Sequence, residues 1–235
     1  MELVYCAAGN RALAQAAISA GFRYGACLPA TFYPDVAPLW FADQRYKKPD
    51  RPAYMAGLER HRPAMATVLD LERVDQRAEV ISWAEEAAQY VQYVVLIPKL
   101  DGLIADLPRC IGGKPVVLGY SVPTSYGGTA VPLWEFAGWP VHLLGGSPRA
   151  QQRLWHHMSA IADVVSADSN YSQKLAIRHC QTWVPGTAHG ARNRWWPTLT
   201  ELDGERWPAE NAHVEAFRRS CATIMASWRS LGALA

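Results

Sequence analysis

Eight short apolar segments in the first 170 residues constrain the fold of this chain more than any other feature. Each has the length of a strand, contains β-branched or aromatic residues, and ends in polar or glycine-rich sequence: Leu3–Ala7, Tyr24–Leu28, Leu39–Ala42, Met65–Leu69, Tyr93–Ile97, Pro115–Tyr120, Val141–Leu144 and Asp163–Ser166. Helical patterns lie between them, at Arg11–Ala20, Pro52–Arg60, Val74–Tyr90 and Pro148–Ala162. Strands that alternate with helices pair in parallel through crossover connections. The pattern therefore predicts a compact α/β fold, a (β/α)8 barrel of the TIM type with some helices shortened or missing.

An open doubly wound sheet is the alternative fold, although no Gly-x-Gly-x-x-Gly motif follows the first strand. We expect residues 1–180 to form the barrel. Residues 181–235 change character: they are rich in Trp, Arg, Pro and Gly, and then show an amphipathic helical pattern over Asn211–Leu231. They predict a C-terminal extension with a terminal helix, packed on the barrel within the same domain.

Composition narrows the class of function. Lys and Arg total 23 against 21 acids, so net charge gives no argument for nucleic acid, and a polyanion site must come from local clusters. The five scattered cysteines form no Cys-x-x-Cys pair, which indicates reduced thiols and no zinc site. The N-terminus does not resemble a secretion signal, and no apolar run reaches membrane-spanning length. We expect a cytoplasmic protein, in the host cytoplasm if a phage encodes it, without metal or cofactor.

Acidic residues stand at the ends of three predicted strands. Asp43 follows one strand, Asp70 and Glu72 end another, and Asp168 ends the last one. Barrel enzymes place their chemistry at the carboxyl ends of the strands, where carboxylates can act as nucleophile or move protons. An acid in this position is also a common turn or helix-capping residue, and that reading stays open for each of the three.

The segment HLLGGSPRAQQRLWHHMSAIADVVSADSN resembles the closing part of the tRNA-guanine transglycosylase superfamily. There a strand, a Gly-rich loop with Pro, and a helix precede the strand that bears the nucleophilic Asp. The stretch LWFADQRYKKPDRPAYMAGLERHRPAMATVLDLER resembles the family region with two further acids. The likeness extends over roughly residues 39–175 and is closest to the small phage-type DNA-guanine transglycosylases. Four features depart from the family. Gln-Arg-Tyr follows Asp43 instead of Ser-Gly-Gly, Pro98-Lys99 replaces the usual Gln-Gly, Gly119-Tyr120-Ser121 stands where a Gly-Gly is usual, and the zinc motif is missing.

The resemblance implies an enzyme that exchanges guanine in a polynucleotide, DNA rather than tRNA, for a free 7-deazaguanine such as a preQ0-type base. Asp168 would be the nucleophile that forms a covalent glycosyl-enzyme, with retention of configuration, and Asp43 would move the proton. The implied substrate-binding residues are Asp70, Phe41, Gly119, Tyr120, Gly145 and Gly146. The missing zinc site leaves room for a partner protein.

Clusters of basic and aromatic residues would hold the polynucleotide by phosphate contacts and stacking. They are Arg45, Lys47 and Lys48, then Lys174 and Arg178, and finally Arg192, Arg194 and Trp195. Ordinary solvated loops would give the same clusters. Two other functions also stay open: another barrel enzyme of the glycoside hydrolase or lyase type, using Asp70, Glu72 and Asp168, and a non-enzymatic nucleic-acid-binding module.

Overall fold

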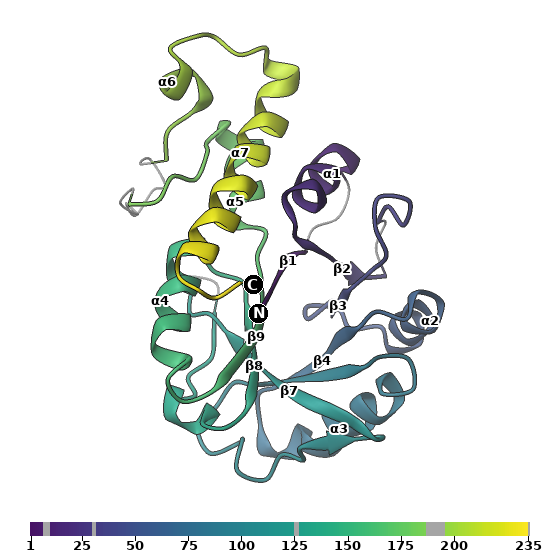
Figure 1. The fold of residues 1–235 in the computed structure, drawn as a ribbon. Helices are drawn as coiled ribbons and strands as arrows, with labels where there is room; N and C mark the ends of the chain where they lie inside the picture. The colour runs from purple at the N-terminus through teal and green to yellow at the C-terminus, as the bar shows by residue number, and fades with distance from the viewer. Residues whose placement is uncertain (7–9, 30–31, 125–126, 187–195, 235) are drawn as a thin grey trace.

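The chain folds into a closed barrel of eight parallel strands. The computed structural model describes residues 1–6, 10–29, 32–124, 127–186 and 196–234 (Figure 1). The barrel strands are β1 (Glu2–Cys6), β2 (Arg23–Leu28), β3 (Phe41–Gln44), β4 (Met65–Leu71), β5 (Tyr93–Pro98), β7 (Lys114–Ser121), β8 (Pro140–Leu144) and β9 (Asp163–Asp168). Each pairs in parallel with its neighbours, and β9 pairs with β1 to close the ring. A two-residue strand, β6 (Cys110–Ile111), adds antiparallel to β7. The predicted (β/α)8 fold and all eight predicted strands are confirmed; Ala7 lies outside the described residues.

Helices cover the outside of this ring incompletely. The described helices are α1 (Arg11–Ala20), α2 (Arg51–His61), α3 (Arg77–Ala87), α4 (Pro148–Met158), α5 (Tyr171–His179), α6 (Leu199–Asp203) and α7 (Ala209–Ser230), with 3-10 turns η1 (Val74–Gln76) and η2 (Leu133–Phe136). The described parts of the connections after β2 and β5 contain no α-helix, and the described part of the connection after β7 has η2 as its one helical turn. The pattern at Val74–Tyr90 splits into η1 and α3. The helix predicted to reach Ala162 ends at Met158, because Ser159–Ala162 turn the chain into β9. None of the helices in the described ranges is both long and apolar enough to cross a membrane.

The barrel interior is filled by side chains from alternate strand positions, as expected for a small barrel. Val4, Phe41, Met65, Val95 and Val117 belong to this inner cluster. Space inside is tight. A Cβ on Gly119 would lie 2.7 Å from Leu144 Cδ1, 2.8 Å from Ile97 Cγ1 and 3.1 Å from Val95 Cγ1. Gly25 is equally enclosed: its Cβ would lie 2.7 Å from Val4 Cγ1. These two glycines let the ring close around its larger side chains.

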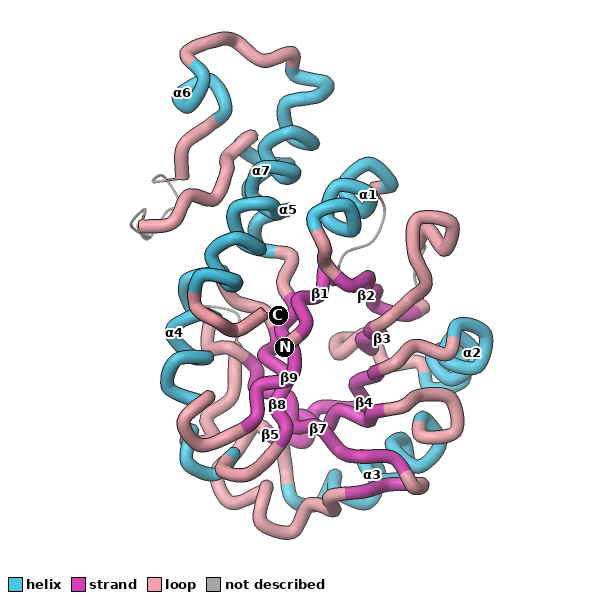
Figure 2. Tube along the Cα trace, viewed as in Figure 1, coloured by secondary structure: helices cyan, strands magenta, loops and turns pink. Residues whose placement is uncertain are grey.

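The C-terminal helix α7 joins the extension to the barrel. It packs on α1 and α5, and Phe217 of α7 contacts Tyr5 of β1 with ring centroids 5.2 Å apart. The N-terminal ammonium group of Met1 donates to the carbonyl of Ala233 at 3.0 Å, so the two ends of the chain lie side by side (Figure 1). The segment around α6 projects from α7 away from the strands (Figures 1 and 2).

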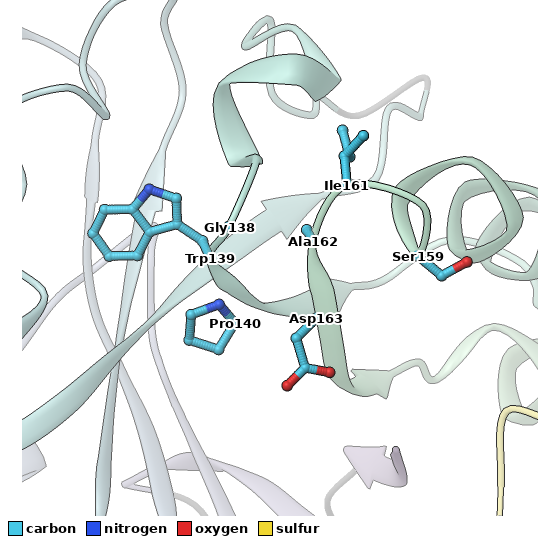
Figure 3. Close-up of a pocket in the computed structure, with 7 residues that line it drawn as sticks. All are labelled: Gly138, Trp139, Pro140, Ser159, Ile161, Ala162 and Asp163. Atoms are coloured by element: carbon cyan, nitrogen blue, oxygen red, sulfur yellow. The ribbon is translucent and has the colours of Figure 1, made fainter.

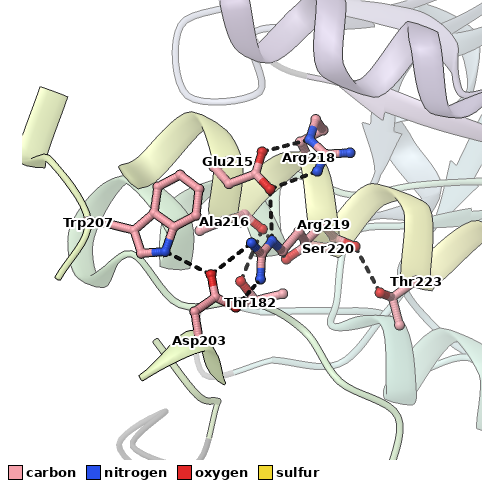
Figure 4. A network of polar contacts seen from close by, with 9 residues as sticks. All are labelled: Thr182, Asp203, Trp207, Glu215, Ala216, Arg218, Arg219, Ser220 and Thr223. Carbon is pink, nitrogen blue, oxygen red and sulfur yellow. Dashed lines mark hydrogen bonds and ion pairs between the residues drawn. The ribbon is translucent and has the colours of Figure 1, made fainter. Parts of the chain in front are cut away.

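A network of ion pairs fastens α6 to α7 (Figure 4). Arg219 forms two hydrogen bonds to Asp203, at 2.7 and 2.8 Å, and a third to Glu215 at 2.8 Å. Its guanidinium lies 5.4 Å from the ring centroid of Trp207, whose indole N–H donates to Asp203 at 2.8 Å. Glu215 also accepts two hydrogen bonds from Arg218. Planar, multidentate pairing of this kind restrains the projecting segment around α6, called the arm below, better than isolated surface ion pairs would.

Candidate active site at the carboxyl ends of the strands

Three carboxylates gather at the carboxyl ends of the barrel strands. Asp43 lies within β3, Asp70 within β4, and Asp168 is the last residue of β9. The strands run further than the sequence predicts, so Asp43 and Asp70 are strand residues and not the first residues beyond. The charges of Asp168 and Asp70 both raise the pKa of Asp43, so the three groups interact electrostatically. The structure therefore places the three predicted acids on three strands at the same rim.

Two β-bulges determine which way two of these acids face. On β4, Val68 and Leu69 stand between Thr67 and Asp70, whereas on β5 a single residue separates their partners Val95 and Ile97. The extra residue gives Asp70 the facing of Ile97, a residue of the inner cluster. If the same residues alternated regularly from Thr67, Asp70 would face the outer side of the barrel.

The second bulge lies on β9. Val165 is inserted between Val164 and Ser166, whose partners on β8 are the consecutive residues Val141 and His142. The insertion brings Ser166 alongside His142, and Asp168 alongside Leu144. The bulge therefore aligns Ser166 and Asp168 with inward-facing residues of β8.

Asp43 has the environment of a proton-transfer group. Its Oδ1 accepts a hydrogen bond from the Thr67 hydroxyl at 2.7 Å and another from the backbone N–H of Gln44 at 2.9 Å. Burial and the negative charge of Asp168 raise the pKa of Asp43 to about 7, against the lowering effect of the Thr67 hydrogen bond. A carboxyl group that titrates near neutral pH can both give and take a proton there.

Asp70 is paired with a lysine that the sequence reading did not include. Lys99, directly after β5, places its Nζ 3.1 Å from Asp70 Oδ2, and both side chains are largely buried, with 17% and 20% exposed. Burial raises the pKa of Asp70, while the Lys99 charge lowers it. The pair presents a hydrogen-bond acceptor beside a donor at the barrel mouth.

Asp168 is held from inside the barrel by a histidine. His142 Nε2 lies 3.2 Å from Asp168 Oδ1, and His142 Nδ1 lies 2.7 Å from the Ser166 hydroxyl oxygen. His142 is 0% exposed, and its ring lies against Phe41 with centroids 4.6 Å apart. Asp168 keeps 13% of its side chain exposed. Its carboxylate therefore stands between the closed interior and the open mouth.

The backbone at Asp168 is fixed by the loop between β8 and α4. Gln151, buried on α4, donates from Nε2 to the carbonyl oxygens of Gly145 at 2.8 Å and Asp168 at 2.6 Å. Ser169 donates to the Gly146 carbonyl at 2.6 Å. Both glycines have positive φ, 71° and 81°, so the tight turn requires residues without a side chain. The predicted Gly-rich loop therefore lies directly beside the predicted nucleophile.

Three of the predicted substrate-binding residues are placed elsewhere. Phe41 is 0% exposed inside the barrel, beneath His142, and offers no free face for stacking. Tyr120 points outward from β7 and packs on Phe136 with ring centroids 5.3 Å apart. Gly119 faces the barrel interior, where it makes room for larger side chains. These residues correct the sequence reading, because alternation along β3 and β7 directs them into packed layers and not to the mouth.

The basic residues of the predicted polynucleotide contacts are exposed. Arg45, Lys47 and Lys48 lie in the loop after β3, where the backbone N–H of Lys48 donates to the carbonyl of Arg45 at 3.1 Å. This turn displays Tyr46, 65% exposed, at its tip, with Lys47 Nζ 5.7 Å from the ring centroid. On α5, Lys174 and Arg178 are also exposed. Arg192, Arg194 and Trp195 lie outside the described residues.

A surface depression marks the opposite end of the barrel (Figure 3). It lies where β8 and β9 begin and is lined by Gly138, Trp139, Pro140, Ser159, Ile161, Ala162 and Asp163. The three carboxylates lie at the other end of these strands, so the depression is separate from the candidate site. Within the described ranges, no three His, Cys, Asp or Glu residues gather as metal ligands.

A protein-family model matches residues 14–229, which is most of the chain. Its description is that of a family of unknown function (DUF6610). The chain belongs to this family. A search of curated proteins found no match. The matched region includes the three acids, His142 and Lys99, so the candidate site lies within the family's boundaries.

The sequence reading missed Lys99, His142, Ser166 and Thr67 as members of the site. Lys99 stands two residues beyond the predicted strand Tyr93–Ile97, whereas Asp43 directly follows the predicted strand Leu39–Ala42. His142, Ser166 and Thr67 sit inside apolar strands, where single polar residues read as satisfied core positions. Only their inward facing and mutual distances assign them to the site.

Proposed function

We propose that this protein is a glycosyl-transferring enzyme that exchanges guanine in a polynucleotide, DNA in the first instance, for a 7-deazaguanine by double displacement. The observation that carries the proposal is the pairing of two unlike carboxyl groups. Asp168 is positioned by His142 and partly exposed, while Asp43, on which the Asp168 charge acts, has a pKa raised to about 7. A fixed nucleophile within electrostatic reach of a neutral-pH acid–base group is what base exchange at C1′ requires.

The chemistry divides into two displacements. Asp168 attacks C1′ as the bond between C1′ and the purine N9 breaks, and the electron pair leaves with the base, which takes up a proton from Asp43. The incoming base, deprotonated at N9 by Asp43, then attacks C1′ and releases the Asp168 carboxylate. Two inversions at C1′ give retention.

The Asp70–Lys99 pair supports guanine recognition. The Watson–Crick edge of guanine carries an acceptor, O6, next to two donors, N1–H and N2–H2. Lys99 offers a donor to O6, and Asp70 offers carboxylate oxygens to the two donors. A 7-deazaguanine has the same edge, so one pair would serve both the departing and the incoming base. The target base must leave its stack to reach the barrel mouth.

The turn after β3 supports a polynucleotide substrate. It places the exposed Tyr46, Lys47 and Lys48 three to five positions after Asp43. An aromatic face flanked by two lysines suits bases and phosphates next to a flipped nucleotide. The exposed cations on α5 begin six residues after Asp168 and could extend this contact.

A base-exchange assay tests the proposal. Purified protein is incubated with a radiolabelled 7-deazaguanine and with either DNA or tRNA, and the label in the acid-precipitated polymer is counted. We expect incorporation into DNA that is lost in Asp168→Asn and kept in Asp163→Asn, an exposed carboxyl at the start of β9.

Three other results would contradict the proposal. Incorporation that survives Asp168→Asn would exclude Asp168 as nucleophile. Incorporation into tRNA alone would replace DNA as the substrate. Polynucleotide binding without exchange, unchanged when all three acids are replaced, would indicate a binding module instead.

A further inference from the structure

We infer that His142 is a neutral positioning residue that donates its Nε2–H to Asp168 Oδ1, with Ser166 holding the ring in that tautomer. Asp168 Oδ2 is then the oxygen that reacts. We call the chain of hydrogen bonds from Ser166 through His142 to Asp168 the relay. The identity of the reacting oxygen rests on the proposed function, whereas the relay itself does not.

The distances restrict the arrangement of protons. His142 Nδ1 and the Ser166 oxygen are 2.7 Å apart, and His142 Nε2 and Asp168 Oδ1 are 3.2 Å apart. If Nδ1 carried the only ring proton, the bare Nε2 lone pair would face a carboxylate oxygen, and two acceptors would be in contact. If Nε2 carries it, Asp168 accepts this proton and the Ser166 hydroxyl donates to Nδ1. Every polar atom of the relay is then satisfied.

Burial and the partners of Ser166 favour a neutral ring, against the attraction of the Asp168 carboxylate for an imidazolium. Both His142 and Ser166 are 0% exposed, and a charged ring would be taken fully out of water. An imidazolium would also donate from Nδ1 to Ser166, which would leave the hydroxyl proton to Met65 Sδ, 3.8 Å away. A thioether is a weak acceptor, whereas an imidazole nitrogen is a strong one. The Ser166 hydroxyl therefore donates its hydrogen bond to an unprotonated Nδ1.

The relay divides the two oxygens of Asp168 between different tasks. Oδ1 is occupied by a donor from inside the barrel, which leaves Oδ2 for the mouth. A hydrogen bond to a carboxylate is stronger than one to the carbonyl of an ester. His142 therefore stabilises Asp168 more as the free carboxylate than in the glycosyl-enzyme, and it favours departure of Asp168 in the second displacement.

Nuclear magnetic resonance of the full chain labelled with 15N-histidine tests the relay without any substrate. The chain has seven histidines, and the His142 signals are those that vanish in His142→Gln. At neutral pH we expect a protonated Nε2, an unprotonated Nδ1, and slow exchange of the Nε2 proton. Asp168→Asn should shift the Nε2 signal and Ser166→Ala the Nδ1 signal, while Asp163→Asn shifts neither. A ring protonated at Nδ1, or at both nitrogens, would overturn the inference.

Covalent trapping adds a readout that a structural role alone would not move. His142→Leu removes the donor, and its glycosyl-enzyme should accumulate several-fold over wild type in denatured samples. His142→Gln places an amide N–H near the position of Nε2 and should restore the wild-type level. Equal accumulation in both variants would refute the role of the donor. Absence of glycosyl-enzyme from wild type would refute the proposed function. The hydrogen bonds of the relay would then be decided by the 15N-histidine spectra alone.

Discussion

Replacing Asp43 by Asn should stabilise the protein at neutral and alkaline pH, and do so less at acid pH. Burial and the Asp168 charge raise the pKa of Asp43 from its ordinary value of 3.8 to about 7. The folded state therefore binds this proton more tightly than the unfolded chain does. The stability from this group is fully present below pH 3.8 and is lost as the pH rises through 7. The Asn side chain keeps an oxygen for the Thr67 hydroxyl, so the substitution removes the charge and leaves that hydrogen bond.

The size of the effect follows from the displacement of the pKa. A displacement of about three pKa units corresponds to at most about 4 kcal/mol of stability. The part of this stability that is lost between pH 5 and pH 8 corresponds to about two pKa units. Because the Asp43 side chain is only partly buried at the barrel mouth, solvent screens part of this, and we expect about 2 kcal/mol.

Urea unfolding at pH 5, 6, 7 and 8 measures this difference. The free energy of unfolding of Asp43→Asn minus that of wild type should grow by about 2 kcal/mol across this range. Asp163→Asn, at an exposed position, serves as the control and should show no such growth. Parallel pH dependence of wild type and Asp43→Asn would refute the assignment of a partly buried acid whose pKa is raised by the Asp168 charge.

Three further predictions concern the barrel, the arm and the basic turn. Gly119→Ala should lower the free energy of unfolding by about 1–3 kcal/mol through overpacking against three side chains. Gly57→Ala on α2, whose Cβ would meet Leu28 alone, at 3.0 Å, should cost less; equal thermal stability of the two variants would contradict the packing argument. Arg219→Ala should cost about 1 kcal/mol and speed amide hydrogen exchange in α6, and unchanged exchange there would show that the ion pairs do not hold the arm. Replacing Lys47 and Lys48 by Ala should weaken polynucleotide binding and reduce the slope of log affinity against log salt by up to about 2, and an unchanged slope would exclude phosphate contacts at the turn.

The barrel was readable from the sequence because each strand has its own local signal. Runs such as Tyr93–Ile97 are apolar, β-branched and bounded by polar residues, and eight of them alternate with helical patterns. Helix α5 was missed because Tyr171–His179 is short and carries basic residues that read as a loop. The short α6 lies in a Trp- and Pro-rich region, and its capping box at Thr198 and Glu201 was the available signal.

The candidate site was readable only in part. An acid at the end of a strand is visible in sequence, and Asp43, Asp70 and Asp168 were found in this way. The facing of a side chain depends on register, and the bulges that set it for Asp70 and Asp168 are inserted residues of ordinary apolar type. For the same reason Phe41 and Tyr120 were assigned to the mouth although both are packed. The role of His142 could be assigned only from the three-dimensional structure, because its partner Asp168 is 26 residues away in the sequence.

The bulge at Val165 has a consequence for the evolution of this family. A deletion of one codon at Val165 would leave Ser166 beside His142 and Asp168 beside Leu144 in a regular ladder, so Asp168 would keep its inward facing. A deletion of one residue between Ser166 and Asp168 would instead turn the Asp168 side chain to the outer face of the barrel, although the aspartate itself would be unchanged. In an alignment of the family, the side of Ser166 on which a gap falls would then decide whether an aligned aspartate still faces the barrel mouth.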